Sequence, residues 1–210
     1  MSDLVFYTNP MSRGRIVRWM LEELGESYET RIVTYGAEMK GTGYLAINPM
    51  GKVPAVVHKD AVITECAAIC AYLADAFPDA KLAPAPGSLE RAPYYRWLFF
   101  AAGPIEQAVT MNALEFEVPP EKQGTVGFGS MDTLLQTLED RLKQSDYIAG
   151  DEFTAADVYV GAQIGWGMQF GTIEKRPAFE TYFGRLASRD AAKRAAEIDD
   201  KLTAEMQAAS

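Results

Sequence analysis

Hydrophobic residues in the first part of the chain follow strand spacing and helix spacing in alternation. Residues 4–7 form a short apolar run typical of a buried strand, and residues 28–33 alternate between polar and apolar side chains like a second strand. Between them, apolar side chains repeat at helical spacing and predict a helix over 11–24. These side chains are Ile16, Val17, Met20, Leu21 and Leu24. The order predicts a β-α-β unit.

The next segment predicts a hairpin followed by another helix. Residues 55–57 and 61–63 are short apolar runs separated by a hairpin-sized gap. Residues 65–76 carry a strong helical pattern, and one short helix is expected in the glycine-punctuated segment before the hairpin. Residues 1–77 therefore have the element order of a thioredoxin-like α/β domain.

The chain changes character at a proline-rich stretch, residues 78–88, which we predict to be a linker. The pattern beyond it is helical throughout. The predicted helices cover 89–115, 128–144, 154–169, 177–187 and 190–206. We therefore predict an α/β plus all-α protein, with a thioredoxin-like N-terminal domain over 1–77 followed by an all-helical C-terminal domain over 89–210.

Composition and charge limit the partners. The 210 residues are 48% hydrophobic and 23% charged, as in an ordinary soluble globular protein. The net charge of -9 repels phosphate backbones, so no nucleic-acid partner is expected. No apolar run is long enough to span a bilayer, and the first residues lack the features of a secretory signal. We expect a cytoplasmic protein without a membrane partner.

The two cysteines, Cys66 and Cys70, are four positions apart in a helical pattern. This spacing favours two buried thiols on one helix face over a disulfide, and it fits a reducing compartment. One histidine and two cysteines do not supply the ligands of a metal site, so no metal is expected.

The most informative local signal is the stretch 48–54, Asn-Pro-Met-Gly-Lys-Val-Pro, which places a proline at the entry to a predicted strand. Proline cannot donate to a sheet ladder, so its place there needs a reason. A cis Val53–Pro54 bond would supply one, since cis bonds occur almost only before proline. The N–H and C=O of Val53 would then face outward, where a peptide-like ligand could pair with them as an extra strand. The alternative is an ordinary loop proline.

Ser12 is a second candidate, because it follows the first strand at or near the start of a predicted helix. Helix N-termini carry unpaired N–H groups and partial positive charge. A hydroxyl there can donate to an anion such as a thiolate, which lowers the thiol pKa and raises the reactive fraction. Serine is also a preferred N-cap, so the residue could equally serve the helix alone.

Charged residues accompany these two features. Glu65 opens a predicted helix whose N-terminus suits a carboxylate, and its own side chain could hold an ammonium group. The pair would fit an amino acid zwitterion, although a solvated glutamate is also favoured in a first helical turn. Lys40 and Lys52 lie on either side of the Pro54 turn and could hold a second carboxylate, or could be solvated loop lysines.

A backbone edge, a zwitterion site, cations and a thiolate donor together describe a site for γ-Glu-Cys-Gly. The chain resembles the cytosolic glutathione transferase superfamily, in its serine-type, bacterial-like members, over nearly its whole length. The resemblance rests on the stretch 48–54, on Thr64-Glu65-Cys66 with the following Ile69 to Ala74, on the helical second half, and on Gly150 to Asp157. Within this last motif Thr154 and Asp157 form a capping-box variant, which the family uses as a folding signature.

The resemblance implies a set of residues that bind glutathione as co-substrate. They are Lys40, Lys52, Val53, Pro54, Glu65 and Cys66. Val53 would pair through its backbone with the cysteinyl part, and Pro54 would be the cis proline. Glu65 and the N–H of Cys66 would hold the γ-glutamyl end, and the two lysines the glycyl carboxylate. The family usually has Ser or Thr at position 66, and a thiol is a weaker donor, which would cost about 0.5–1.5 kcal/mol of binding.

The resemblance also implies the chemistry. Ser12 would be the catalytic residue, with Tyr7 ranked second because it lies too far upstream of Arg15 for the tyrosine-type pattern. The electrophile would be small and apolar, in a pocket that we predict to include Met11, Met111 and Trp166. Core packing is the alternative for the last two.

We therefore expect a detoxifying transferase that forms homodimers and adds the glutathione thiolate to an electrophilic carbon. Two alternatives keep the same fold. The first is other glutathione-dependent chemistry, namely reduction, ether cleavage or isomerisation. A cysteine at position 12 would have favoured reduction, and serine stands there. The second is a binding module without turnover.

Overall fold

The structure is a computed structural model that describes residues 3–209. Its contacts divide into two compact units: one runs up to Ala80 and resumes at Arg189, and the other is Lys81–Ser188. The predicted bounds assign the whole of 89–210 to the helical domain, whereas the segment after Arg189 has its contacts in the first unit. Residues 1–2 and 210, which those bounds include, lie outside the described residues.

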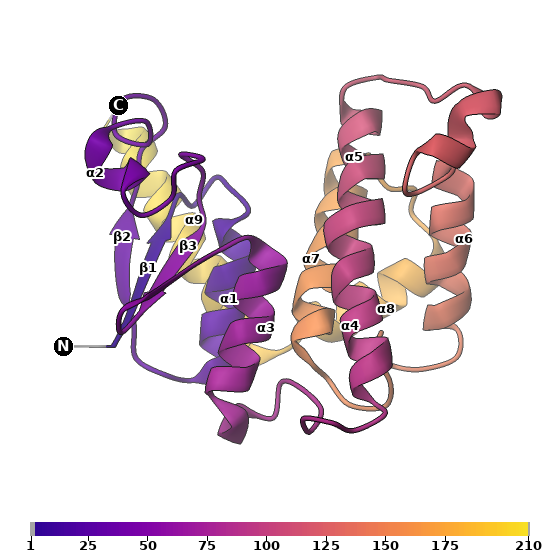
Figure 1. Ribbon diagram of the computed structural model, residues 1–210, viewed down its shortest axis with the longest axis horizontal. Coiled ribbons are helices and arrows are strands. Elements are labelled where there is room, and N and C mark those ends of the chain that lie inside the picture. The colour runs from indigo at the N-terminus through magenta and orange to yellow at the C-terminus, as the bar shows by residue number, and fades with distance from the viewer. Residues whose placement is uncertain (1–2, 210) are drawn as a thin grey trace. The chain divides into compact units, whose positions relative to one another are not determined.

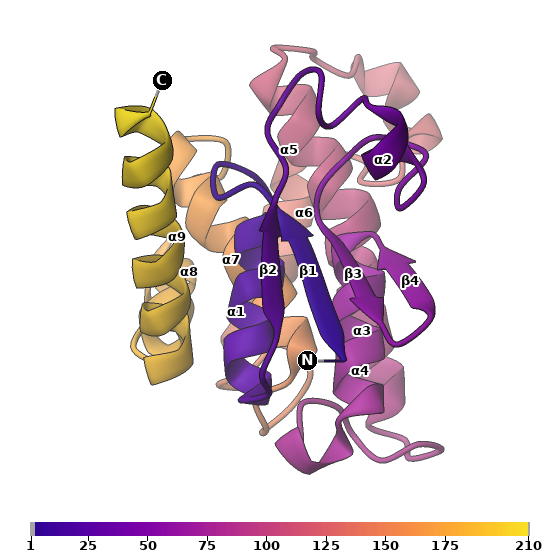
Figure 2. The ribbon, with the colours of Figure 1, turned by 90° about the vertical axis from the view of Figure 1, so that its left-hand side faces the viewer.

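Within residues 3–209 the first unit holds one four-stranded sheet in the order β2-β1-β3-β4. The strands are β1 (Leu4–Thr8), β2 (Glu29–Ile32), β3 (Ala55–His58) and β4 (Ala61–Thr64). β1 is parallel to β2 and antiparallel to β3, which in turn is antiparallel to β4. The ends of β1, β2 and β4 and the start of β3 therefore lie at one end of the sheet (Figure 2).

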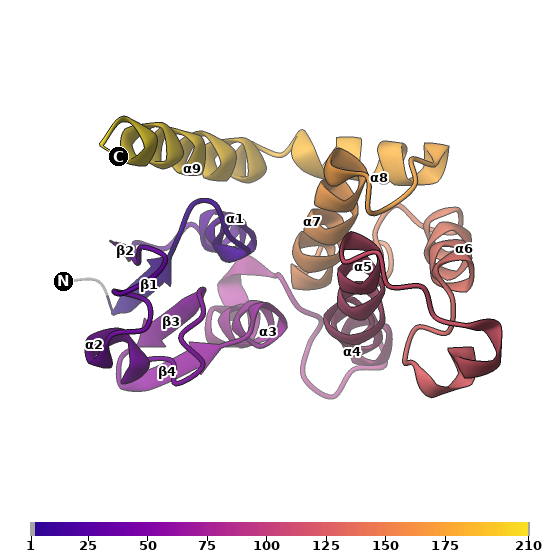
Figure 3. The ribbon, with the colours of Figure 1, turned by 90° about the horizontal axis from the view of Figure 1, so that it is seen from above.

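Two helices cover one face of this sheet, α1 (Gly14–Leu24) and α3 (Cys66–Ala76) (Figure 3). The short helix α2 (Thr42–Leu45) completes the predicted thioredoxin-like order, and the 3-10 turn η1 (Pro78–Ala80) lies in the segment predicted to be a linker. Leu4 and Phe6 of β1 are buried with the apolar face of α1 because alternate residues of a strand point to the same side. The predicted start of the first helix at residue 11 is wrong, since α1 begins at Gly14.

The last helix, α9 (Asp190–Ala208), packs along α1 in the same unit (Figure 2). The sequence pattern predicts this helix but does not indicate its partner, which lies far away along the chain. Ala191, Ala195 and Asp199 are buried on α9, and Ile198 and Leu202 are half-buried.

The second unit is helical, as predicted (Figure 1). Its elements are α4 (Arg91–Phe100), the π-helical turn η2 (Ala101–Ile105), α5 (Glu106–Ala113), the 3-10 helix η3 (Pro120–Thr125), α6 (Met131–Leu142), α7 (Ala155–Phe170) and α8 (Pro177–Ala187). The helix predicted over 89–115 is interrupted at η2, because Pro104 cannot donate the intrahelical hydrogen bond at its position.

The capping box predicted before α7 is present. The Thr154 N–H donates to Asp157 Oδ2 at 2.9 Å, and the Thr154 side chain accepts from the start of the helix. Among the described residues, no helix combines the length and the apolar character needed to cross a bilayer.

Candidate active site

The segments that carry Ser12, Pro54 and Glu65 meet at one end of the sheet in the first unit. β1 leads into the turn 9–13, β3 begins directly after Pro54, and β4 ends directly before Glu65. Ala55 pairs with residues of both β1 and β4, which places the three segments side by side. Ligands of open α/β sheets bind in the crevice at such strand ends.

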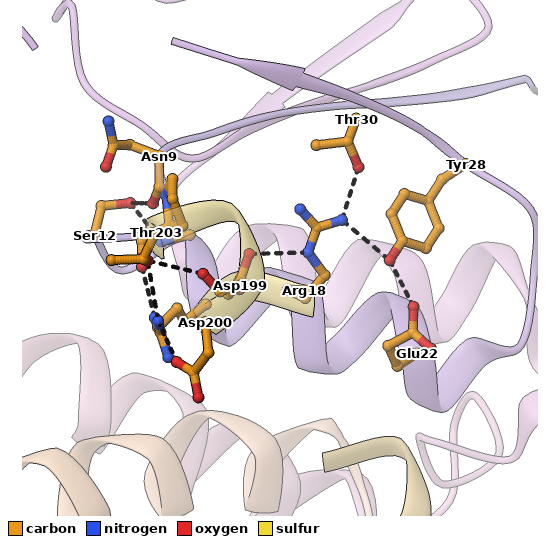
Figure 4. Close-up of polar contacts among 12 residues, drawn as sticks. Asn9, Ser12, Arg18, Glu22, Tyr28, Thr30, Asp199, Asp200 and Thr203 are labelled. Atoms are coloured by element: carbon orange, nitrogen blue, oxygen red, sulfur yellow. Dashed lines mark hydrogen bonds and ion pairs between the residues drawn. The ribbon is translucent and has the colours of Figure 1, made fainter. Parts of the chain in front are cut away.

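Ser12 lies inside the turn 9–13, one residue before the N-cap of α1 (Figure 4). Its Oγ donates to the carbonyl of Asn9 at 2.6 Å and accepts from the N–H of Gly14 at 2.9 Å. A Cβ on Gly14 would collide with Thr8 Oγ1, so only glycine fits between the strand end and the serine. The hydroxyl oxygen therefore accepts a hydrogen bond from one of the N–H groups at the helix start that have no partner within the helix.

Asn9 holds this turn in place, although it is not among the site residues predicted from the sequence. The side chain is buried; its Nδ2 donates to the carbonyl of Val33 at 3.1 Å, and its Oδ1 accepts from the N–H of Met11 at 3.0 Å. The second bond makes an Asx turn. The Asn9-Pro10 dipeptide is the signal that could have found it, because Asn-Pro marks turns.

The Val53–Pro54 bond is cis, as predicted. Within the described part of the chain, the N–H and C=O of Val53 have no hydrogen-bond partner. The carbonyl of Lys52, in contrast, accepts from Tyr44 Oη at 2.7 Å and Asn48 Nδ2 at 2.8 Å. Burial raises the pKa of Tyr44 to about 12, so its phenol remains a donor. The hydrogen bonds to Lys52 hold the turn in place, and the main chain of Val53 remains able to bind a ligand.

The two predicted lysines differ in their surroundings. Lys40 Nζ donates to the carbonyls of Met50 at 3.1 Å and Gly51 at 2.8 Å, so it braces the loop before β3. An ammonium has three donors, and one remains on Lys40. Gly51 has a φ of 56° and lies against this lysine, which explains the glycine. The side chain of Lys52 is exposed.

Glu65 and Cys66 connect β4 to α3. Glu65 is exposed and has φ 68° and ψ 121°, an unusual conformation for a residue other than glycine. Such conformations cost about 1–3 kcal/mol and gather at binding sites. Cys66 is buried, and its Sγ donates to the carbonyl of Arg13 at 3.7 Å. This contact joins the start of α3 to the turn that holds Ser12.

Tyr7 occupies a different environment from Ser12. It lies on β1 between two buried residues, Phe6 and Thr8, and so points to the opposite face of the sheet. Its Oη accepts from Arg31 Nη1 at 3.0 Å, and its ring lies 5.8 Å from that of Tyr44. The tyrosine proton remains available for donation, so Tyr7 stays the second candidate.

The predicted pocket residues belong to different units. Met11 is 49% exposed beside Ser12, with Tyr35 Oη donating to its carbonyl at 3.1 Å. Met111 of α5 lines a cavity of about 470 Å³ within the helical unit. Trp166 of α7 is half-buried and does not line that cavity. The assignment of these residues to one electrophile pocket stays a prediction.

Cys66 and Cys70 remain thiols on α3, as their spacing predicts. Burial raises the pKa of the Cys70 thiol well above its ordinary value, and the neighbouring Cys66 adds to the shift. A thiol of raised pKa is a poor nucleophile, so Cys70 serves packing.

Comparison with known proteins places both parts of the chain in one family. Residues 11–76 match the family model for the N-terminal domain of glutathione S-transferase, and residues 102–190 match the model for its C-terminal domain. Glutathione S-transferase GstA of Escherichia coli O157:H7 is 31% identical over 167 residues, which is 79% of this chain and 79% of that protein.

Solved structures agree with this relationship. A glutathione transferase from Methylococcus capsulatus has a TM-score of 0.78 at 28% identity, covering 94% of this chain and 98% of that one. A sphingomonad glutathione S-transferase complexed with glutathione has a TM-score of 0.75 at 28% identity, covering 93% and 98%. Together with the family models and the E. coli relative, these matches show that the chain belongs to the glutathione S-transferase family.

Proposed function

We propose that this chain conjugates the glutathione thiolate to small apolar electrophiles. The observation that carries the proposal is the main chain of Val53, which has no hydrogen-bond partner among residues 3–209 and lies at the same sheet end as Glu65 and Ser12. The relatives named as glutathione transferases, and the sphingomonad structure that contains glutathione, support the same ligand.

Each part of glutathione has a suitable partner. The cysteinyl amide would pair with the N–H and C=O of Val53 as an added strand. The Glu65 carboxylate would hold the γ-glutamyl ammonium, and the N–H of Cys66 at the start of α3 would hold its carboxylate. Lys52, whose side chain is exposed, and the remaining donor of Lys40 would hold the glycyl carboxylate.

Ser12 would stabilise the thiolate rather than remove its proton. The Ser12 hydroxyl donates to the Asn9 carbonyl at 2.6 Å, and a hydroxyl can rotate toward a stronger acceptor such as a thiolate. The N–H of Gly14 donates to the same Oγ, which polarises the hydroxyl and makes it a better donor. The helix start thereby stabilises the anion through Ser12.

The reaction follows from this arrangement. The glutathione thiol loses its proton to solvent, and the thiolate sulfur attacks an electrophilic carbon. With 1-chloro-2,4-dinitrobenzene as the electrophile, a carbon–sulfur bond forms and chloride leaves with the electron pair of the broken bond. Holding both reactants together supplies much of the rate. We further propose a cytoplasmic homodimer that acts in detoxification, with Met11, Met111 and Trp166 contacting the electrophile.

Glutathione binding measured by calorimetry tests the proposal. We expect saturable binding by the wild type, and roughly tenfold weaker binding by Glu65→Gln, because an ion pair with the ammonium is lost. Glu26→Gln is the matched control: Glu26 is an exposed carboxylate in the same unit, just after the far end of α1. No binding at millimolar glutathione, or equal weakening by both substitutions, would contradict the proposed site.

Cys66→Ser gives a second, smaller test. A serine hydroxyl is a stronger donor than a thiol and would bond the γ-glutamyl carboxylate, so we expect a Kd lowered about two- to tenfold. Cys66→Ala removes the donor and controls for the change in size. Tighter binding by the alanine variant would show that position 66 makes no such bond.

A further inference from the structure

Helices α9 and α1 lie side by side (Figure 2), and ion pairs join them. In chain order they are Arg189, the residue just before α9, with Glu23 at 2.7 Å, Arg194 with Glu22 at 3.1 Å, Asp199 with Arg18 at 3.2 Å and Asp200 with Arg15 at 2.7 Å. The order along α9 is the reverse of that along α1. The C-terminal part of α9 therefore lies beside the N-terminal end of α1, where the turn 9–13 carries Ser12.

The pair at this end reaches into the turn itself. Arg15 Nε donates to the carbonyl of Pro10 at 2.6 Å, while its Nη2 donates to Asp200 Oδ1 at 2.7 Å and to Thr203 Oγ1 at 3.4 Å. Proline has no N–H, so the carbonyl is the backbone group by which Pro10 can be held. One planar guanidinium thus connects α9 with the turn that contains Ser12.

The neighbouring pair fixes the register of α9. The side chains of Arg18 and Asp199 are only 2% and 1% exposed. Arg18 also donates to Tyr28 Oη at 3.1 Å and Thr30 Oγ1 at 2.7 Å, which ties α9 to β2 (Figure 4). Because a buried charge without its partner is strongly unfavourable, the pair resists sliding of the helix. Asp200, the next residue, is held opposite Arg15 as a result.

We propose that Arg15 and Asp200 are positioning residues through which α9 holds the Ser12 turn in its reactive geometry. The inference rests on the proposed function, since it concerns how Ser12 meets the thiolate. In this arrangement Asp200 anchors the guanidinium, and the guanidinium anchors the Pro10 carbonyl. Without the anchor the turn gains freedom and Ser12 Oγ moves relative to the sulfur. A displacement of about 1 Å costs up to roughly 100-fold in rate.

The test compares Asp200→Asn with Arg194→Gln, each of which removes one ion pair between the same two helices. We expect Asp200→Asn to lower kcat roughly tenfold and to move the pH profile of kcat/KM to higher pH, with little change in the KM for glutathione. Asp200→Glu keeps a carboxylate and should retain most of the activity. Arg15→Lys keeps the charge but lacks the planar fork, so it should resemble Asp200→Asn.

The remaining outcomes separate positioning from stability. Equal losses in Asp200→Asn and Arg194→Gln, or an unchanged kcat and pH profile in Asp200→Asn, would overturn the inference and leave the proposed function standing. A wild type that binds no glutathione would refute the proposed function. Amide hydrogen exchange of residues 11–14 would still decide whether Asp200 holds the turn, since it should be faster in Asp200→Asn than in Arg194→Gln.

Discussion

Replacing Ser12 with alanine is expected to lower kcat for conjugation roughly 100-fold, with little effect on the affinity for glutathione. The Ser12 Oγ lies 2.9 Å from the N–H of Gly14 and is the donor proposed to meet the thiolate. Without it, the anion loses its stabilising hydrogen bond, so the pKa of the bound thiol should rise. Steady-state kinetics from about pH 6 to about pH 9 cover the range in which a thiol ionises. The pH profile of kcat/KM should therefore be shifted to higher pH in Ser12→Ala.

Tyr7→Phe is the matched control for this prediction, because it also removes one hydroxyl from the first strand-to-helix region. The lost oxygen accepts from Arg31 at 3.0 Å, and we expect kcat to stay nearly unchanged. Ser12→Thr keeps a hydroxyl and should restore much of the activity. If Tyr7→Phe abolished conjugation while Ser12→Ala left it intact, Tyr7 would be the thiolate donor and the assignment of Ser12 would be wrong.

Much of the fold was predictable because local signals agree with tertiary contacts. The hairpin of β3 and β4 follows from two apolar runs with a short gap, and α8 begins and ends at the predicted residues, 177 and 187, with Pro177 at its start. The cis bond before Pro54 was predictable from a proline at a strand entry. These features depend on residues that are close together in the sequence.

The start of α1 was not predictable from hydrophobic spacing. Met11 fits the apolar pattern, but Asn9 accepts from its N–H and Ser12 accepts from that of Gly14. Such hydrogen bonds between side chains and the backbone compete with helical hydrogen bonds, so the helix begins at a later residue than the apolar pattern predicts. The site depends on this later start, because Ser12 then lies in the turn instead of in the helix.

The packing of α9 against α1 could not be predicted from the sequence, for a different reason. Helical spacing predicts the helix, but charged residues on its surface are compatible with solvent as well as with α1. Arg18 is the residue that could have indicated the contact, since it lies among the buried positions of α1 and a buried arginine needs a partner. Its partner, Asp199, lies 181 residues further along the chain, beyond the reach of local patterns.

The largest effect on stability is expected from Asp157→Ala, which should lower the free energy of unfolding by about 3–5 kcal/mol, since each buried donor left without an acceptor costs about 1–3 kcal/mol. The buried carboxylate accepts from the N–H of Ile148 at 2.7 Å, the N–H of Thr154 at 2.9 Å and Tyr182 Oη at 2.8 Å. Burial raises the pKa of Tyr182, so its hydroxyl remains protonated and needs this acceptor. Urea unfolding followed by circular dichroism measures the loss.

Asp132→Ala is the matched control, because Asp132 also lies in the first turn of a helix of the same unit. It is 91% exposed, and its ion pair with Arg176 is 3.7 Å long, so we expect a loss below about 1 kcal/mol. The loss in the free energy of unfolding for Asp157→Asn should lie between those of the two alanine variants, since an amide keeps one of the two acceptor oxygens. Equal losses in both alanine variants would show that the helix dipole, rather than the buried hydrogen bonds, accounts for the contribution of Asp157. Losses that decrease from Asp157→Ala through Asp157→Asn to Asp132→Ala would instead assign the contribution of Asp157 to its hydrogen bonds. The donors of these bonds belong to Ile148, Thr154 and Tyr182, and water cannot reach them in the folded protein.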